Sequence, residues 1–158
     1  MTRKGGMLAL AALLVVIDQL TKAAVAKGLA LYETRRVIPG FLNLVHSRND
    51  GAIFGFLSHG GNPALRWVLA AASVVALALV IYYFVKTPSR DGLMLTALSL
   101  ILAGAVGNNL DRMARGSVVD FVDLYAGRFH WPVFNVADAC ITIGAGLLIF
   151  VVFRRKPA

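Results

Sequence analysis

Charged side chains and cysteine are scarce in this sequence. Only 15% of its 158 residues are Asp, Glu, Lys or Arg, whereas soluble domains carry about a quarter charged residues. The single cysteine, Cys140, excludes an internal disulfide framework and a metal cluster built from cysteines. Hydrophobic residues make up 58% of the chain. The composition therefore indicates an integral membrane protein, and a chain of this length is expected to form a single membrane domain, residues 1–158.

The net positive charge of the chain does not indicate that it binds nucleic acid. The formal net charge is +8. In a chain this apolar, Lys and Arg serve mainly as topology signals and as contacts for anionic lipids. We therefore expect membrane lipids as partners and no nucleic acid.

Four long apolar stretches predict the fold class, an all-α integral membrane protein. A helix needs about 20 apolar residues to cross the bilayer core, and lipid favours helices because their backbone groups bond internally. The predicted transmembrane helices cover about residues 7–26, 65–85, 92–110 and 134–153. The extracytoplasmic loops would then be about 27–64 and 111–133.

The first stretch has a second interpretation. Arg3, Lys4 and the sequence Ala24–Ala26 resemble a secretory signal with its cleavage site. Asp18 and Lys22 interrupt the region that such a signal keeps apolar, so a retained span is favoured. Four spans place both termini on one side. The basic residues on that side lie in short segments beside span ends, which predicts that both termini are cytoplasmic.

The first long loop contains strand-forming residues. Residues 36–38 and 41–46 are rich in β-branched and aromatic side chains, and Pro39–Gly40 between them is a turn signal. This pattern predicts a small hairpin or sheet that lies on the membrane surface.

Five of the eight acidic residues fall in or beside the predicted spans. A charged group at mid-bilayer costs about 2.5–3.5 kcal/mol on insertion scales, so such residues usually face a partner or a cavity. Spacing of three or four residues places polar side chains on the same helix face as several of these acids. The resulting polar clusters are expected to lie near one membrane face. The acids are Asp18, Asp111, Asp120, Asp123 and Asp138, and their neighbours include Lys22, Asn108, Arg112 and Asn135.

Each cluster also has a purely structural interpretation. Asn135 followed by Asp138 resembles a helix-capping box, and Asp18 with Lys22 is favoured as a structural ion pair. Asp111 beside Arg112 is equally consistent with an interfacial helix end.

Asp120 is flanked on both sides by apolar residues, which is not expected of an acid in a solvated loop. The three histidines are not at metal-ligand spacing, so no metal site is predicted. The serines lack a partner for nucleophilic catalysis.

Two carboxyl groups in a partly dry site suggest one kind of chemistry. They cannot both ionise easily, so the pair tends to hold one proton. The ionised member can deprotonate a water, and the protonated member can donate to a carbonyl oxygen or a leaving amine. Asp120 and Asp138 are suited to this metal-free amide hydrolysis, because Pro132 between them allows the chain to fold back.

Five polar motifs follow one another along the chain. They are Asp18-Gln19-Leu20-Thr21-Lys22, Asn49-Asp50-Gly51-Ala52-Ile53-Phe54, Gly107-Asn108-Asn109-Leu110-Asp111-Arg112, Val118-Val119-Asp120-Phe121 and Phe134-Asn135-Val136-Ala137-Asp138. With these motifs in this order, the whole chain resembles one family, the bacterial lipoprotein signal peptidases, or signal peptidase II.

The resemblance implies an intramembrane aspartic endopeptidase without cofactor or metal. It would remove the signal peptide from diacylglyceryl-modified prolipoproteins, cutting just before the lipidated cysteine. Asp120 and Asp138 would be the catalytic dyad. The supporting residues would be Asn49, Gly51, Asn108, Arg112, Asn135, Asp18, Lys22 and Asp111.

The resemblance also implies a location and an outer structure. The protein would be a multi-pass protein of the bacterial cytoplasmic (inner) membrane, with its active site near the outer face, and we expect a monomer. A small extracytoplasmic β-sheet and a short surface helix near Gly51–Gly61 would cover the site. Asp123 and Cys140 receive no role.

Two other classes of function are weighed against this prediction. A transporter would need polar residues along a path across the membrane, but the cytoplasmic halves of the last three spans are almost purely apolar. A structural membrane protein would use the Asp18–Lys22 and Asp111–Arg112 pairs only to hold its helices together.

Overall fold

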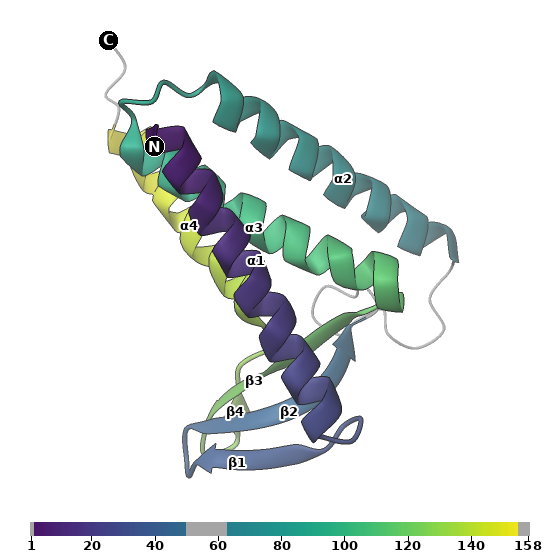
Figure 1. Cartoon of the computed structure of the whole chain (residues 1–158). Helices are drawn as coiled ribbons and strands as arrows, with labels where there is room; N and C mark the ends of the chain where they lie inside the picture. Colours follow the sequence, from purple (N-terminus) through teal and green to yellow (C-terminus); the bar gives the residue numbers. More distant parts are fainter. Residues whose placement is uncertain (1, 50–62, 155–158) are drawn as a thin grey trace.

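The computed structural model of the chain describes residues 2–49 and 63–154. Within this part, the chain forms four helices and two pairs of strands, each pair following a helix (Figure 1). The elements are α1 (Arg3–Gly28), β1 (Thr34–Ile38), β2 (Leu42–Asn49), α2 (Pro63–Lys86), α3 (Gly92–Arg115), β3 (Val118–Ala126), β4 (Phe129–His130) and α4 (Val136–Arg154). The surface helix expected near Gly51–Gly61 lies outside the described residues.

Three of the helices are long and apolar enough to cross a membrane, namely α1, α3 and α4. In α2 the apolar stretch found among the described residues, Ala71–Lys86, is shorter, so the fourth span stays a prediction. The helix α3 continues five residues beyond the predicted end of the third span at residue 110, to Arg115. There Gly116 adopts a left-handed conformation (φ 74°) and its N–H bonds to the carbonyl of Arg112, a common way to end a helix.

Small residues bring α3 and α4 into close contact. A Cβ placed on Gly104 of α3 would lie 2.2 Å from the carbonyl oxygen of Ala137, and one on Gly144 of α4 would lie 2.8 Å from that of Ala97. Only glycine allows backbones to approach this closely. On the other side of α3, Ser73 of α2 donates a hydrogen bond to Asn109 (2.8 Å).

The strands form one antiparallel arrangement in the order β1-β2-β3-β4. The predicted hairpin is confirmed as β1 and β2. Strands β3 and β4 were not predicted, since their residues were assigned to the loop at 111–133. The first four residues of β3 are all buried, so the sequence lacks the alternation of polar and apolar residues that marks a half-buried strand.

The sheet lies across the ends of α1 and α4 (Figure 1). Phe121 of β3 packs against Val25 and Leu29 at the end of α1. The carbonyl of Phe134, just before α4, accepts hydrogen bonds from the backbone N–H groups of Phe121 (3.1 Å) and Val122 (2.8 Å). These contacts hold β3 against the first turn of α4.

Candidate active site

A buried lysine on α1 organises the polar cluster where the helices meet the sheet. The ammonium of Lys22 has no solvent exposure. It contacts Asp18 (2.9 Å) and Asp111 (3.0 Å) and donates a hydrogen bond to Asn108 (3.0 Å). All three of its protons therefore have acceptors, as a buried charge requires. The predicted Asp18–Lys22 ion pair is confirmed.

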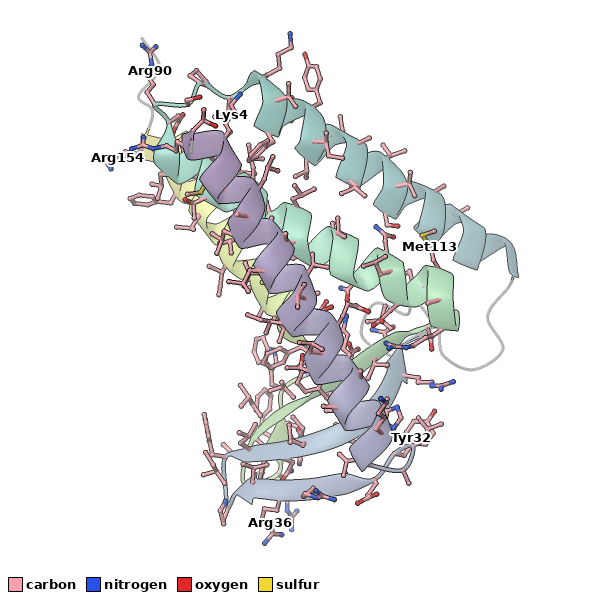
Figure 2. All side chains as sticks on the ribbon, viewed as in Figure 1. Lys4, Tyr32, Arg36, Arg90, Met113 and Arg154 are labelled. Atoms are coloured by element: carbon pink, nitrogen blue, oxygen red, sulfur yellow. The ribbon has the colours of Figure 1, made fainter. Side chains whose placement is uncertain are left out.

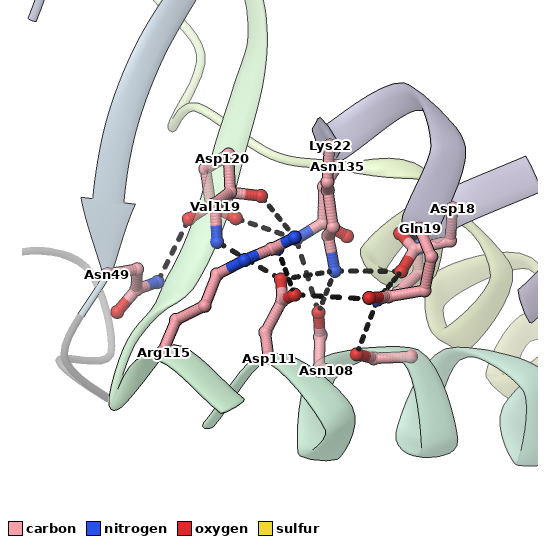
Figure 3. A network of polar contacts seen from close by, with 12 residues as sticks. Asp18, Gln19, Lys22, Asn49, Asn108, Asp111, Arg115, Val119, Asp120 and Asn135 are labelled. Atoms are coloured by element: carbon pink, nitrogen blue, oxygen red, sulfur yellow. Dashed lines mark hydrogen bonds and ion pairs between the residues drawn. The ribbon is translucent and has the colours of Figure 1, made fainter. Parts of the chain in front are cut away.

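Asp111 of α3 is fully buried and has two cationic partners. One is Lys22 and the other is Arg115, one helical turn further on. Its second oxygen also accepts the backbone N–H of Val119 at the start of β3 (3.2 Å; Figure 3). The Asp111–Arg112 pair of the structural alternative is replaced by these two partners, because residues four apart share a helix face and adjacent residues do not. Two carboxylates and two cations thus balance in charge.

Asp18 links the same cluster to α4. Its carboxylate accepts the backbone N–H of Ala137 in the first turn of α4 (2.9 Å), where a helix leaves such donors without internal partners. Gln19, for which no role was predicted, donates to Asp18 and to the carbonyl of Gly107 (3.1 Å each). A Cβ on Gly107 would lie 2.6 Å from the Asp18 carboxylate, so glycine is required there.

Asn135 lies fully buried between the two predicted catalytic acids. Its side-chain amide donates to Asp120 (2.7 Å) and to Asn108 (3.2 Å). Its backbone N–H donates to the carboxylate of Asp138 (3.2 Å), and its side-chain oxygen accepts the N–H of Asp138 (2.9 Å). These reciprocal bonds are the capping box that the spacing predicted. A residue that caps α4 therefore also connects Asp120 to Asp138.

The two carboxyl groups sit in different surroundings. Asp138 lies on the first turn of α4 and is half-buried. Besides the N–H of Asn135, it accepts a hydrogen bond from the amide of Asn108 (2.8 Å). Since Asn108 is itself bonded to the Lys22 ammonium, its amide group is held with the NH₂ directed at Asp138.

Asp120 of β3 is almost completely buried, with 4% of its surface exposed. Its two oxygens accept hydrogen bonds from Asn49 of β2 (3.1 Å) and from Asn135. Burial and, secondly, the nearby charge of Asp138 raise the pKa of Asp120 to about 6, although the hydrogen bonds from Asn49 and Asn135 act in the opposite direction. A carboxyl group tuned in this way can hold a proton near neutral pH.

Most of the predicted site residues meet in this cluster; two of them, and Asp123, for which no role was predicted, need separate mention. Arg112 is half-buried, and its guanidinium makes no hydrogen bond or ion pair with another described residue. Gly51 lies outside the described residues. Asp123 lies elsewhere on the sheet, where it accepts a hydrogen bond from Asn43 (2.8 Å) and contacts His130 (2.7 Å).

Comparison with known proteins gives consistent matches. The family described as Signal peptidase (SPase) II matches residues 10–154. A lipoprotein signal peptidase of Syntrophus aciditrophicus is 43% identical over 148 residues, covering 92% of this chain and 91% of that protein. One of Paraburkholderia phymatum is 46% identical, covering 94% of this chain and 87% of that protein.

Solved structures also match over nearly the whole chain. One, described as a bacterial membrane enzyme, has a TM-score of 0.82 and 33% identity and covers 98% of this chain and 94% of its own. A second with the same description has a TM-score of 0.80 and 35% identity.

Proposed function

Because this chain belongs to the signal peptidase II family, we propose that it is a membrane-embedded aspartic endopeptidase whose dyad is Asp120 and Asp138. It removes the signal peptide from diacylglyceryl-modified prolipoproteins, cutting just before the lipidated cysteine. The main support for this dyad is that Asn135, from one buried position, donates hydrogen bonds to both carboxyl groups.

The two acids are expected to differ in the resting enzyme. Asp138 accepts two N–H donors at the start of a helix, where the helix dipole favours a negative charge. Burial instead favours the neutral form of Asp120. We therefore assign the negative charge to Asp138 and the proton to Asp120.

This assignment gives a balanced hydrolysis. Asp138 removes a proton from a water, whose oxygen attacks the carbonyl carbon of the scissile peptide bond. Asp120 donates its proton to the carbonyl oxygen, which avoids a full negative charge there. The tetrahedral intermediate then collapses. Asp138 passes its new proton to the leaving nitrogen as the C–N bond breaks, and a hydroxyl of the intermediate returns a proton to Asp120, so both acids regain their starting states.

The surroundings of the dyad support separate roles for the other residues. Lys22, with the carboxylates of Asp18 and Asp111, is a structural centre that fixes Asn108 and the start of α4. Arg112, whose guanidinium has no partner among the described residues, is available to hold a carbonyl of the substrate backbone. Asn49 stands at the edge of the described sheet beside Asp120 and is placed to orient that acid.

The distribution of basic residues supports the proposed orientation in the membrane. Lys4, Arg90 and Arg154 lie at the ends of the helices opposite the sheet (Figure 2). Arg3 and Lys4 also donate to backbone carbonyls of Arg90 (3.0 Å) and Val85 (2.7 Å). Basic residues beside span ends favour the cytoplasm, so the dyad would lie near the outer face of the cytoplasmic membrane.

Substitution of each acid tests the dyad. In purified protein in detergent, Asp120→Asn and Asp138→Asn should each abolish cleavage of a lipidated precursor peptide, because neither amide can exchange the required proton. Asp123→Asn is the matched control, since Asp123 is also buried on β3 but lies outside the dyad, and it should retain cleavage.

Thermal unfolding of each variant separates loss of chemistry from loss of fold. Asp120→Asn should remain folded at pH above about 6, because it removes a carboxylate whose ionisation burial disfavours. Cleavage at the wild-type rate by either dyad variant would rule out the proposed mechanism.

A further inference from the structure

The end of the sheet far from the dyad carries a group of exposed apolar side chains. We call it the sheet tip and define it as Ile38, Phe41, Phe129 and Trp131, which are 47%, 54%, 64% and 57% exposed. They come from both connections at that end, the β1–β2 turn and the segment around β4. Soluble surfaces avoid grouping several such residues, so this end of the sheet is suited to a contact with something apolar.

Hydrogen bonds hold the two halves of the sheet tip together. The N–H of Gly40 donates to the hydroxyl of Tyr125 (2.8 Å), and the N–H of Tyr125 donates to the carbonyl of Phe41 (2.9 Å). On the other half, the N–H of Trp131 donates to the carbonyl of Leu124 (2.8 Å). The tip is therefore a fixed part of the sheet.

Asp123, which has no place in the dyad, belongs to this arrangement. It connects Asn43 of β2 to His130 of β4. The ring of His130 stacks on Tyr125, with centroids 5.2 Å apart and an interplanar angle of 10°. Three strands are thus tied together directly behind the exposed aromatic residues, so the tip needs no reordering when it meets a partner.

We propose that the sheet tip inserts into the lipid leaflet on the side of the membrane that carries the sheet. The sheet crosses the ends of apolar helices and extends sideways beyond them (Figure 1), which places its tip at the level of the lipid headgroups. Aromatic residues, Trp above all, favour this level. Exposed Arg128, in the turn beside Phe129, supplies the positive charge that lipid phosphates attract.

One position on the same sheet, Arg36 of β1, serves as a water-facing comparison for the tip. Arg36 of β1 points away from the helices (Figure 2), so a side chain at this position faces water. The sheet thus has an apolar tip and a charged position on β1. The tip contacts lipid, and the β1 residue Arg36 stays in the aqueous phase. The inference concerns only this surface and does not depend on the assignment of the dyad.

Fluorescence of Trp131 tests the proposal directly. The chain has two tryptophans, so Trp67→Phe leaves Trp131 as the only one. The variant is placed in vesicles of phosphatidylcholine and phosphatidylglycerol with brominated acyl chains. Brominated lipid should quench Trp131 relative to unbrominated lipid, whereas aqueous iodide should have little effect. If Trp67→Phe fails to fold, the difference between wild type and Trp131→Phe gives the same signal.

The matched control moves the tryptophan to the water-facing side of the sheet. Arg36→Trp, made with Trp67→Phe and Trp131→Phe, should be quenched by iodide and not by brominated lipid. Arg128→Glu should make Trp131 more accessible to iodide. Quenching of Trp131 by iodide and not by lipid would overturn the proposal, and so would shielding from both quenchers, which would indicate a protein partner at the tip.

Discussion

Removal of the Asn49 amide should shift the pH dependence of cleavage in a defined direction. Asn49 donates to Asp120 at 3.1 Å and stabilises its ionised form. In Asn49→Ala that bond is lost, so the pKa of Asp120 rises from its present value of about 6. A hydrogen bond to a charged group contributes about 1.5–3 kcal/mol. Because Asn49 is only half-buried and water can replace part of the bond, we expect the lower end, which corresponds to about one pKa unit.

The sign follows from the proposed role of Asp120 as the proton donor. The enzyme is active while Asp120 is protonated, so cleavage falls as the pH rises through its pKa. In Asn49→Ala the alkaline limb of kcat/KM should move upward by about one pH unit, because kcat/KM reports the free enzyme. If Asp120 were instead the ionised base, the substitution would move the acidic limb upward.

A lipidated precursor peptide with a fluorescent reporter, assayed in detergent across the pH range, measures both limbs. Asn43→Ala is the matched control, because Asn43 also lies on β2 and also donates to an aspartate of β3, Asp123 (2.8 Å). Its pH profile should match the wild type. An unmoved or downward-shifted alkaline limb in Asn49→Ala, or an equal shift in Asn43→Ala, would refute the reasoning.

Two further predictions concern the packing that holds the site. Lys22→Met should lower the free energy of unfolding by about 3–5 kcal/mol, because it leaves two buried carboxylates without their shared cation. Denaturant unfolding in detergent measures this, and a loss within experimental error would contradict a structural role for the lysine. Gly104→Ala should destabilise by about 1–3 kcal/mol, since its Cβ would lie 2.2 Å from the Ala137 carbonyl. Gly6→Ala, which meets nothing within 4 Å, should be neutral or slightly stabilising, and equal effects of the two glycine substitutions would argue against the close helix contact.

Hydrophobic content and length were sufficient to predict the helices, because backbone hydrogen bonds in lipid have to close within each helix. The hairpin at β1 and β2 was predictable for a similar local reason, the turn at Pro39–Gly40. The pair Asp18–Lys22 and the capping box of Asn135 and Asp138 were readable from spacing on a single helix. These features depend on residues within one turn or one loop of each other.

Contacts between distant segments were decided only by the tertiary structure. Strand β3 was missed because its buried residues come from both faces, so no alternation marks it. The cationic partners of Asp111, Lys22 and Arg115, were not predicted, and its bond to Val119 could not be foreseen. Asp123 found its partners only when β2, β3 and β4 paired.

The convergence on Asn135 is the clearest case of this difference. The sequence by itself determined that Asn135 caps a helix and that Asp120 and Asp138 are acids in apolar surroundings. It did not determine that one buried amide group donates to an acid on a strand while its own backbone holds an acid on a helix. That arrangement requires β3 to pack against the first turn of α4 through Phe134, and such packing depends on the complementary shapes of segments far apart in the chain.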